Sequence, residues 1–190
     1  MDKDFLRKKI LAIRNKIDKE IRKTKDEKIA QNLFSQTEYI NARQVMFFAS
    51  FKSEPNTLPM IARALTQGKR VVVPRVNIKE RWLDIFEIKD LDELKPGCMN
   101  IPEPAVGDER LFDKRGLELI VMPGVVFDSR GGRIGYGGGY YDKLLGQMES
   151  KPPLIALAYV EQIVDSVPVL EHDVLVDKII TDEGVWIGKR

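Results

Sequence analysis

The sequence contains few of the residues from which many catalytic and metal sites are built. Its single cysteine, Cys98, excludes an internal disulfide and a cysteine metal cluster, and its single histidine, His172, excludes a zinc site made of several histidines. No apolar run approaches the roughly 20 residues of a membrane-spanning helix. The opening residues, MDKDFLRKKI, lack the apolar segment of a signal peptide. We therefore expect a soluble protein of the reducing cytoplasm, without a membrane partner.

The chain also lacks a charge excess of either sign. Its 31 lysines and arginines against 29 aspartates and glutamates leave a formal net charge of +2, which gives no general reason to expect a nucleic-acid partner. With 43% apolar and 32% charged residues, the composition is typical of a soluble globular protein. No repeat or linker divides the 190 residues, so we expect a single α/β domain over residues 1–190, and a monomer.

Apolar residues at spacings of three and four predict a helix over about residues 4–22. Its apolar face carries Leu6, Ile10, Ile13, Ile17 and Ile21. The pattern Thr24-x-x-Glu27 matches a capping box, in which each side chain satisfies the other residue's free backbone N–H, and predicts a second helix over about 25–38. Further helices are expected between Thr57 and Gly68 and from near Tyr140.

Short apolar or alternating segments between these helices predict strands. They are residues 45–50, 70–76 with Pro74 at its end, 80–90, 117–123, 153–159 and a terminal pair within 177–187. Residues 95–110, which contain several prolines, are expected to form a loop. The alternation of strands and helices predicts a three-layer α/β/α sandwich with a mainly parallel sheet.

Residues 131–145, GGRIGYGGGYYDKLL, hold the densest cluster of glycines and follow a predicted buried strand. Bare backbone N–H groups beside Arg133 favour an anion such as phosphate, and Asp142 could hold magnesium. The segment matches neither the P-loop nor the dinucleotide-binding fingerprint. By itself the cluster indicates an anion-binding loop or, with about equal weight, a glycine-rich surface turn.

The segment R-I-G-Y-G-G-G-Y-Y-D closely resembles the signature of the 5-formyltetrahydrofolate cyclo-ligases, also called methenyltetrahydrofolate synthetases. Four further segments resemble that family in the same order along the chain. They are Lys3-x-x-Leu6-Arg7, Ser53-Glu54-Pro55-Asn56-Thr57, Pro123-Gly124-Val125-Val126-Phe127-Asp128, and Val167-Pro168 with His172-Asp173. The resemblance spans almost the whole chain and implies a fold similar to the sugar-phosphate isomerase and CoA-transferase superfold.

The resemblance implies an enzyme that uses ATP and Mg²⁺ to cyclise 5-formyltetrahydrofolate to 5,10-methenyltetrahydrofolate through a phosphorylated formyl (iminophosphate) intermediate. It assigns catalytic roles to Arg133 and Tyr140 and metal binding to Asp142 and Asp173. The residues implied to bind ATP are Lys3, Arg7, Arg133, Ile134, Gly135, Tyr136, Gly137, Gly138, Gly139, Tyr140 and Tyr141. Those implied to bind the folate, with or without a polyglutamate tail, are Glu54, Tyr136, Gly137, Gly138, Gly139 and Tyr140.

Other interpretations of the same residues stay open at this point. A sugar-phosphate isomerase-like enzyme would bind a phosphate without ATP, and a non-catalytic nucleotide- or folate-binding module would lack turnover. An RNA-binding module that uses the basic first helix is disfavoured by the near-zero net charge. Lys3 and Arg7 alone would indicate a solvated basic face, His172 a structural role, and Trp82 and Phe86 packing rather than stacking on a ligand.

Overall fold

The computed structural model describes residues 2–170 and 173–188, and its centre is a seven-stranded sheet. The strand order is β12 (Gly184–Ile187), β11 (Lys178–Thr181), β9 (Leu154–Leu157), β6 (Leu119–Met122), β1 (Gln44–Met46), β2 (Arg70–Asn77) and β3 (Trp82–Ile88). The inner strands pair in parallel, whereas β2–β3 and β11–β12 are antiparallel. The predicted mainly parallel sheet is therefore confirmed.

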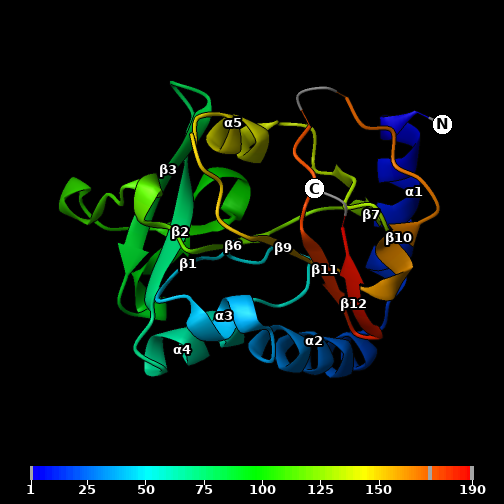
Figure 1. Ribbon diagram of the computed structural model, residues 1–190, viewed down its shortest axis with the longest axis horizontal. Helices are drawn as coiled ribbons and strands as arrows, with labels where there is room; N and C mark the ends of the chain where they lie inside the picture. Colours follow the sequence, from blue (N-terminus) through cyan, green and yellow to red (C-terminus); the bar gives the residue numbers. More distant parts are fainter. Residues whose placement is uncertain (1, 171–172, 189–190) are drawn as a thin grey trace.

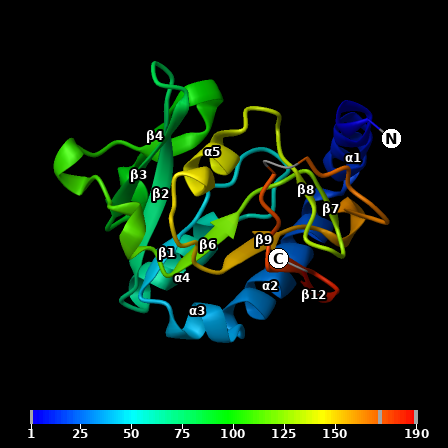
Figure 2. The ribbon, with the colours of Figure 1, turned by 45° about the horizontal axis from the view of Figure 1, so that its top comes forward.

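Helices cover both faces of this sheet (Figure 1). α2 (Lys19–Phe34), α3 (Thr37–Asn41) and α4 (Leu58–Thr66) lie on one face, and α5 (Tyr140–Gly146) lies on the other. Figure 2 shows the same arrangement after a turn about the horizontal axis, with α1 (Lys3–Lys16) at one end of the sheet. The predicted three-layer α/β/α architecture is confirmed.

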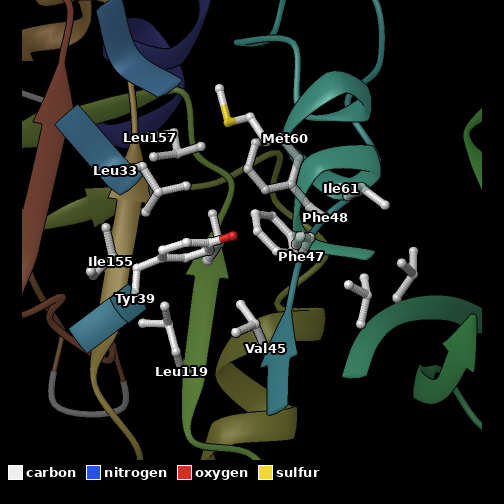
Figure 3. Packing of buried hydrophobic residues seen from close by; sticks show 14 of the residues in the cluster. Leu33, Tyr39, Val45, Phe47, Phe48, Met60, Ile61, Leu119, Ile155 and Leu157 are labelled. Carbon is white, nitrogen blue, oxygen red and sulfur yellow. The ribbon is translucent and has the colours of Figure 1, made fainter. Parts of the chain in front are cut away.

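Alternate residues of each inner strand point into two different cores, as the two-residue period of a strand requires. In β6, Leu119 belongs to the cluster beneath α2, α3 and α4, whereas Ile120 belongs to the cluster beneath α5. Figure 3 shows the first cluster, in which Leu33 and Tyr39 from the helices meet Leu119 and Ile155 from the strands. The central strands β6 and β9 are apolar throughout because both of their faces are covered.

A smaller sheet supports the glycine-rich segment. It consists of β10 (Ile163–Val164), β7 (Val126–Asp128) and β8 (Arg133–Ile134), and α1 buries Leu6 and Ile10 against it in a third apolar cluster. The chain then passes from β8 into α5 above the large sheet (Figure 1). The glycine-rich loop, residues 135–139, therefore has a fixed strand before it and a fixed helix after it.

The segment expected to be a loop contains regular structure. β4 (Leu94–Pro96) and β5 (Pro102–Pro104) form an antiparallel hairpin beyond β3. Prolines do not prevent this pairing, because each strand of a two-stranded ribbon has one open edge. A proline whose nitrogen points to that edge removes no hydrogen bond between the strands. The 3₁₀ turns among the described residues are η1 (Leu91–Glu93), η2 (Cys98–Asn100), η3 (Asp108–Arg110), η4 (Lys114–Gly116) and η5 (Val160–Gln162).

The first predicted helix is two helices in the structure. α1 ends at Lys16 because Ile17 adopts an extended conformation, and the Asp18 carboxylate then accepts the backbone N–H groups of Glu20 and Ile21 at the start of α2. The expected capping box is therefore wrong. Thr24 lies inside α2, where its hydroxyl donates to the carbonyl of Glu20 at 3.3 Å.

The buried face of α1 also differs from the prediction. Leu6, Ile10 and Arg14 are buried, whereas Ile13 and Ile21 are 39% and 54% exposed. The strict spacing of four along α1 continues the buried face through Arg14. The break after Lys16 then gives α2 an orientation of its own, and this exposes Ile21.

Two strand predictions need correction. β1 ends at Met46, earlier than residue 50, and Pro74 lies within β2 rather than at its end. Beyond Val72, β2 pairs only with β3. Pro74 lacks a backbone N–H, but no residue of β1 lies opposite it to need that donor. Within residues 2–170 and 173–188, no helix has both the length and the apolar character needed to cross a membrane.

Asp128, at the end of β7, is the buried anchor of the small sheet. Its carboxylate accepts the backbone N–H groups of Arg130, Gly132 and Val167 at 2.9, 3.0 and 2.8 Å, and the Arg130 guanidinium at 2.8 Å. Burial raises its pKa, but these donors outweigh burial and hold the pKa below the ordinary 3.8. The charged form therefore stabilises the folded state.

We expect Asp128→Asn to lower the free energy of unfolding by about 2–3 kcal/mol at neutral pH, because bonds to a charged acceptor are lost. Since the carboxyl pKa is lowered on folding, this stabilisation is complete above pH 3.8 and disappears as the pH falls through the lower folded value. Urea denaturation at neutral and acidic pH measures the difference. Asp108→Asn, whose side chain is 94% exposed, should leave stability unchanged. An equal loss in both variants would contradict the assignment.

Candidate active site

Arg133 is the charged centre of the glycine-rich segment. Its side chain is only 5% exposed, and its Nη2 donates to Asp142 Oδ1 at 2.9 Å. Nη1 donates to the carbonyl oxygen of Pro123 at 3.4 Å, just after β6. The structure therefore brings together the predicted phosphate-binding arginine and one predicted metal ligand.

The glycines of the loop have conformational and steric roles. Gly137 and Gly139 have φ values of +100° and +66°, which L-residues rarely adopt. A Cβ built on Gly139 would meet no other atom within 4 Å, so the space above this position is open. A Cβ on Gly137 would lie 3.7 Å from the guanidinium of Arg7. The loop thus has free space on one side and a cation on the other.

The first turns of α1 face this loop. Arg7 Nε donates to the carbonyl oxygen of Gly135 at 2.8 Å, and its Nη1 pairs with Asp4. Lys3 Nζ forms an ion pair with Asp173, the second predicted metal ligand. Lys3 and Arg7 are therefore not part of a solvated basic face, because both reach across to the site.

The two predicted metal ligands are both paired with cations of the site, Asp173 with Lys3 and Asp142 with Arg133. Asp142 Oδ1 also accepts the backbone N–H of Val174 at 3.4 Å, which links it to the residue after Asp173. No group of three or more potential metal ligands occurs in the described part of the chain. Two carboxylates still suit Mg²⁺, which commonly takes one or two protein carboxylates and completes its shell with waters and phosphates.

Glu54 lies in the loop after β1 and is almost fully buried. Its Oε2 accepts the backbone N–H of Phe51 at 2.8 Å. Burial raises the pKa of the carboxyl, and this rise is opposed by hydrogen bonds from the Tyr136 hydroxyl and the Phe51 N–H and by the charge of Arg14. The predicted folate ligand therefore faces the glycine-rich loop, as expected from its position after a parallel strand.

Arg14 was not expected in the site. It is 1% exposed and donates to Ser53 Oγ at 3.1 Å, to the carbonyl oxygen of Gly124 at 3.3 Å and to the Tyr136 hydroxyl at 2.6 Å. The sequence carried one signal of this role: Leu6, Ile10 and Arg14 are spaced by four, so a cation continues the apolar stripe of the helix.

Comparison with known proteins identifies the family of this chain. Residues 1–182 match the model of the 5-formyltetrahydrofolate cyclo-ligase family. The chain belongs to the 5-formyltetrahydrofolate cyclo-ligase family. The mouse 5-formyltetrahydrofolate cyclo-ligase is 33% identical over 82% of this chain and 81% of its own length, and that of Escherichia coli K12 is 28% identical over 84% and 89%.

Two solved structures share the fold. The 5,10-methenyltetrahydrofolate synthetase of Aquifex aeolicus superimposes with a TM-score of 0.87 at 28% identity, and the match covers 100% of this chain and 94% of that one. The enzyme of Mycoplasma pneumoniae superimposes with a TM-score of 0.76 at 26% identity, covering 96% and 99%. The cyclo-ligase fold is therefore shared over the whole length of this chain.

In this family member, two buried polar atoms beside the loop have no hydrogen-bond partner among the described residues. They are Arg133 Nε and the hydroxyl of Tyr141. Burial and the nearby charge of Glu54 raise the pKa of Tyr141, so its hydroxyl stays protonated and can donate. Unpartnered buried donors are uncommon in folded proteins, and a polar ligand in the site would satisfy them.

The remaining predicted residues divide into lining and packing positions. Tyr140 packs its ring against the core beneath α5, and Ile134 buries its side chain against α1, so only the backbone of Ile134 borders the loop. Phe86 is buried under the guanidinium of Arg75, 3.8 Å from its ring centroid, which makes it a packing residue. His172 lies outside the described residues.

We expect Gly139→Ala to weaken ATP binding at least about tenfold in a folded protein, because the methyl group enters the open space above the loop. Gly68→Ala provides a matched control. Gly68 has a similar φ of +75°, also with no atom within 4 Å of a built Cβ, and it lies after α4, away from the loop. Both variants should lose similar stability, and only the first should lose ATP affinity by calorimetry. Equal ATP affinities would show that no ligand approaches Gly139.

Proposed function

We propose that this protein is a 5-formyltetrahydrofolate cyclo-ligase, which converts 5-formyltetrahydrofolate and ATP into 5,10-methenyltetrahydrofolate, ADP and phosphate. The observation that carries the proposal is that two loops lie side by side in this family member. One is the open glycine-rich loop with the cations Lys3, Arg7 and Arg133, and the other holds the buried carboxylate of Glu54.

The chemistry requires activation of a poor leaving group. The formyl oxygen attacks the γ-phosphorus of ATP, ADP leaves, and the formyl carbon becomes part of an iminophosphate. The folate N10 then attacks this carbon and closes the ring, N10 loses its proton to solvent, and the C–O bond breaks so that phosphate leaves carrying the former formyl oxygen. The protein needs to align the two substrates and neutralise charge on the transferred group, rather than form a covalent bond itself.

In this proposal, Arg133 and Tyr140 are the catalytic residues at the transferred group. Lys3, Arg7 and the backbone of residues 134–139, with Tyr140 and Tyr141, hold the nucleotide. Arg133 supports this role because its guanidinium is buried, fixed by Asp142, and still has an unpartnered Nε. A guanidinium keeps its charge at any working pH, so it neutralises phosphate oxygens throughout the reaction.

The residues that would hold Mg²⁺ are Asp142 and Asp173. When bound, the ion would neutralise charge on the phosphate oxygens. Both carboxylates are paired with cations in this structure, and the same cations are the proposed phosphate ligands. We infer an exchange of partners on binding, in which Asp142 and Asp173 would hold the metal and Lys3 and Arg133 would hold the phosphates.

Glu54, Tyr136 and Gly137, Gly138, Gly139 and Tyr140 form the proposed folate side of the site. The Glu54 carboxylate would accept hydrogen bonds from polar N–H groups of the pterin. The buried position of Glu54 supports this role, because a fixed acceptor selects a donor pattern more sharply than a solvated one. We further propose that one domain carries both subsites in a cytoplasmic monomer, whether or not the folate bears a polyglutamate tail.

The proposal is tested by turnover. Mixing the protein with 5-formyltetrahydrofolate and Mg-ATP should increase the near-ultraviolet absorbance of the methenyl product, in equal amount to the ADP formed. ATP consumption without the absorbance change would indicate a different acceptor. Phosphate binding without either change would favour an isomerase-like enzyme or a binding module.

The proposed exchange of partners predicts that one substitution changes the affinities for metal-free ATP and for Mg-ATP in opposite directions. Asp142→Asn frees Arg133, so ATP without magnesium should bind several-fold to about tenfold more tightly than to the wild type, since one charge-assisted bond becomes available. Mg-ATP should bind more weakly, because a metal ligand is lost. Calorimetry with and without the metal measures both affinities.

Glu38→Gln is the matched control for this experiment. It breaks the Lys178–Glu38 ion pair of 2.7 Å, which lies near α3 and the start of β11 and away from the glycine-rich loop. Neither affinity should change in that variant. A change of the same sign for both forms of ATP in Asp142→Asn would contradict the exchange.

A further inference from the structure

Arg14 is a buried charge whose hydrogen-bond partners are neutral. Within the described residues, its guanidinium donates to a hydroxyl, a carbonyl and a phenol, and no carboxylate lies within ion-pairing distance of it. Burying a charge that forms no direct ion pair is costly, so the position requires an explanation beyond packing. The side chain could be replaced by an apolar one if stability were its only purpose.

The three acceptors of Arg14 belong to segments that meet only at the proposed site. Ser53 precedes Glu54 in the loop after β1, Gly124 follows β6, and Tyr136 lies in the glycine-rich loop. The hydroxyl of Tyr136 accepts from Arg14 and interacts with the Glu54 carboxyl. One side chain of α1 therefore connects the proposed folate ligand with the proposed nucleotide loop.

We propose that Arg14 is a positioning residue that fixes the Glu54 loop against the glycine-rich loop, so that the folate and nucleotide subsites form as one unit. This inference rests on the proposed cyclo-ligase function. Phosphoryl transfer to the formyl oxygen requires both substrates in line, and a displacement of about 1 Å in such an arrangement can cost a hundredfold in rate. The planar fork of a guanidinium can hold three acceptors in fixed directions, which an ammonium group cannot do equally well.

Arg14 also supplies the positive charge that opposes the effect of burial on Glu54. The other groups around Glu54 are the phenols of Tyr136, Tyr141 and Tyr159, and Asp26, which accepts from the Tyr159 hydroxyl at 2.8 Å. The pKa values of all three tyrosines are raised by burial, so these phenols stay neutral through neutral pH. Loss of Arg14 should therefore raise the pKa of Glu54 without titrating the phenols.

Arg14→Met, which keeps the length and removes the charge, tests the inference by calorimetric binding of 5-formyltetrahydrofolate at several pH values. We expect affinity at least about tenfold weaker than wild type at neutral pH, because a charge-assisted network is lost. Affinity should recover as the pH rises and Glu54 ionises, whereas the wild-type affinity stays flat. Arg14→Lys, which retains the charge, should restore the flat profile while turnover stays reduced.

Three further variants show which residues cause the pH dependence of folate affinity. Arg110→Met removes a partly buried arginine paired with Glu93 in the segment after β3, and it should leave folate affinity and its pH profile unchanged. Glu54→Gln added to Arg14→Met should abolish the pH dependence; persistence would assign the titration to Asp26 and overturn the role through Glu54. If Arg14→Met does not fold, Tyr136→Phe breaks the same connection at its centre and should reproduce the pH-dependent loss.

The outcomes separate the inference from the function on which it rests. A wild-type protein that does not bind 5-formyltetrahydrofolate would overturn both. A wild-type protein that binds and turns over the folate, with Arg14→Met or Tyr136→Phe showing the same affinity and pH profile, would overturn only the positioning role. If Arg14→Met lost the same factor of folate affinity at every pH, Arg14 would have a structural role only.

Discussion

The guanidinium of Arg133 lies almost entirely out of solvent, and the Asp142 carboxylate 2.9 Å away compensates its charge. This pair joins β8 of the small sheet to the first turn of α5, so it fixes both ends of the glycine-rich loop. The loop itself has little intrinsic stiffness because glycines carry no side chain to pack. Its shape therefore depends on what is anchored at either side of it, on Asp128 in the small sheet and on the apolar residues of α5.

Three cations beside the glycine-rich loop, Lys3, Arg7 and Arg133, are each paired with a carboxylate of the protein, whereas Arg14 is bonded to neutral groups. A cluster of unpaired cations would repel and would have to be held together by packing energy. Two cation–carboxylate pairs avoid this cost, and they leave the site poised for ligands that carry the same two signs of charge, a metal ion and a phosphate chain. Proposed ligand recognition and structural stability thus use the same side chains in two arrangements.

The sequence predicted the central sheet well because apolar runs such as LELIVMP report burial on both faces directly. It predicted α5 because the glycine-rich segment is followed by the glycine-free residues YYDKLL from Tyr140. It misplaced the break between α1 and α2, because Asp18 and Thr24 are both acceptable caps and only the packing of Ile17 and the following turn decides between them. The pairing of β4 with β5 was not visible, since it depends on chain geometry rather than on alternation.

For the site, the resemblance supplied the residues but not their partners. Lys3 and Asp173 were both expected, and only the folded chain shows that they pair with each other. Arg14 was not among the expected site residues, and arginine is usually exposed. Its burial results from acceptors in three segments distant in sequence, and a local pattern cannot report such contacts.

The contacts of α1 also bear on the order in which the molecule assembles. Arg14 and Tyr136 are separated by 122 positions, Arg7 and Gly135 by 128, and Lys3 and Asp173 by 170. A ribosome has to synthesise most of the chain before the first helix can complete its side-chain contacts. Bonds of such long range form late in folding because the loop they close is large. Until then, the large sheet can form around its own apolar cores while the catalytic end of the molecule stays open.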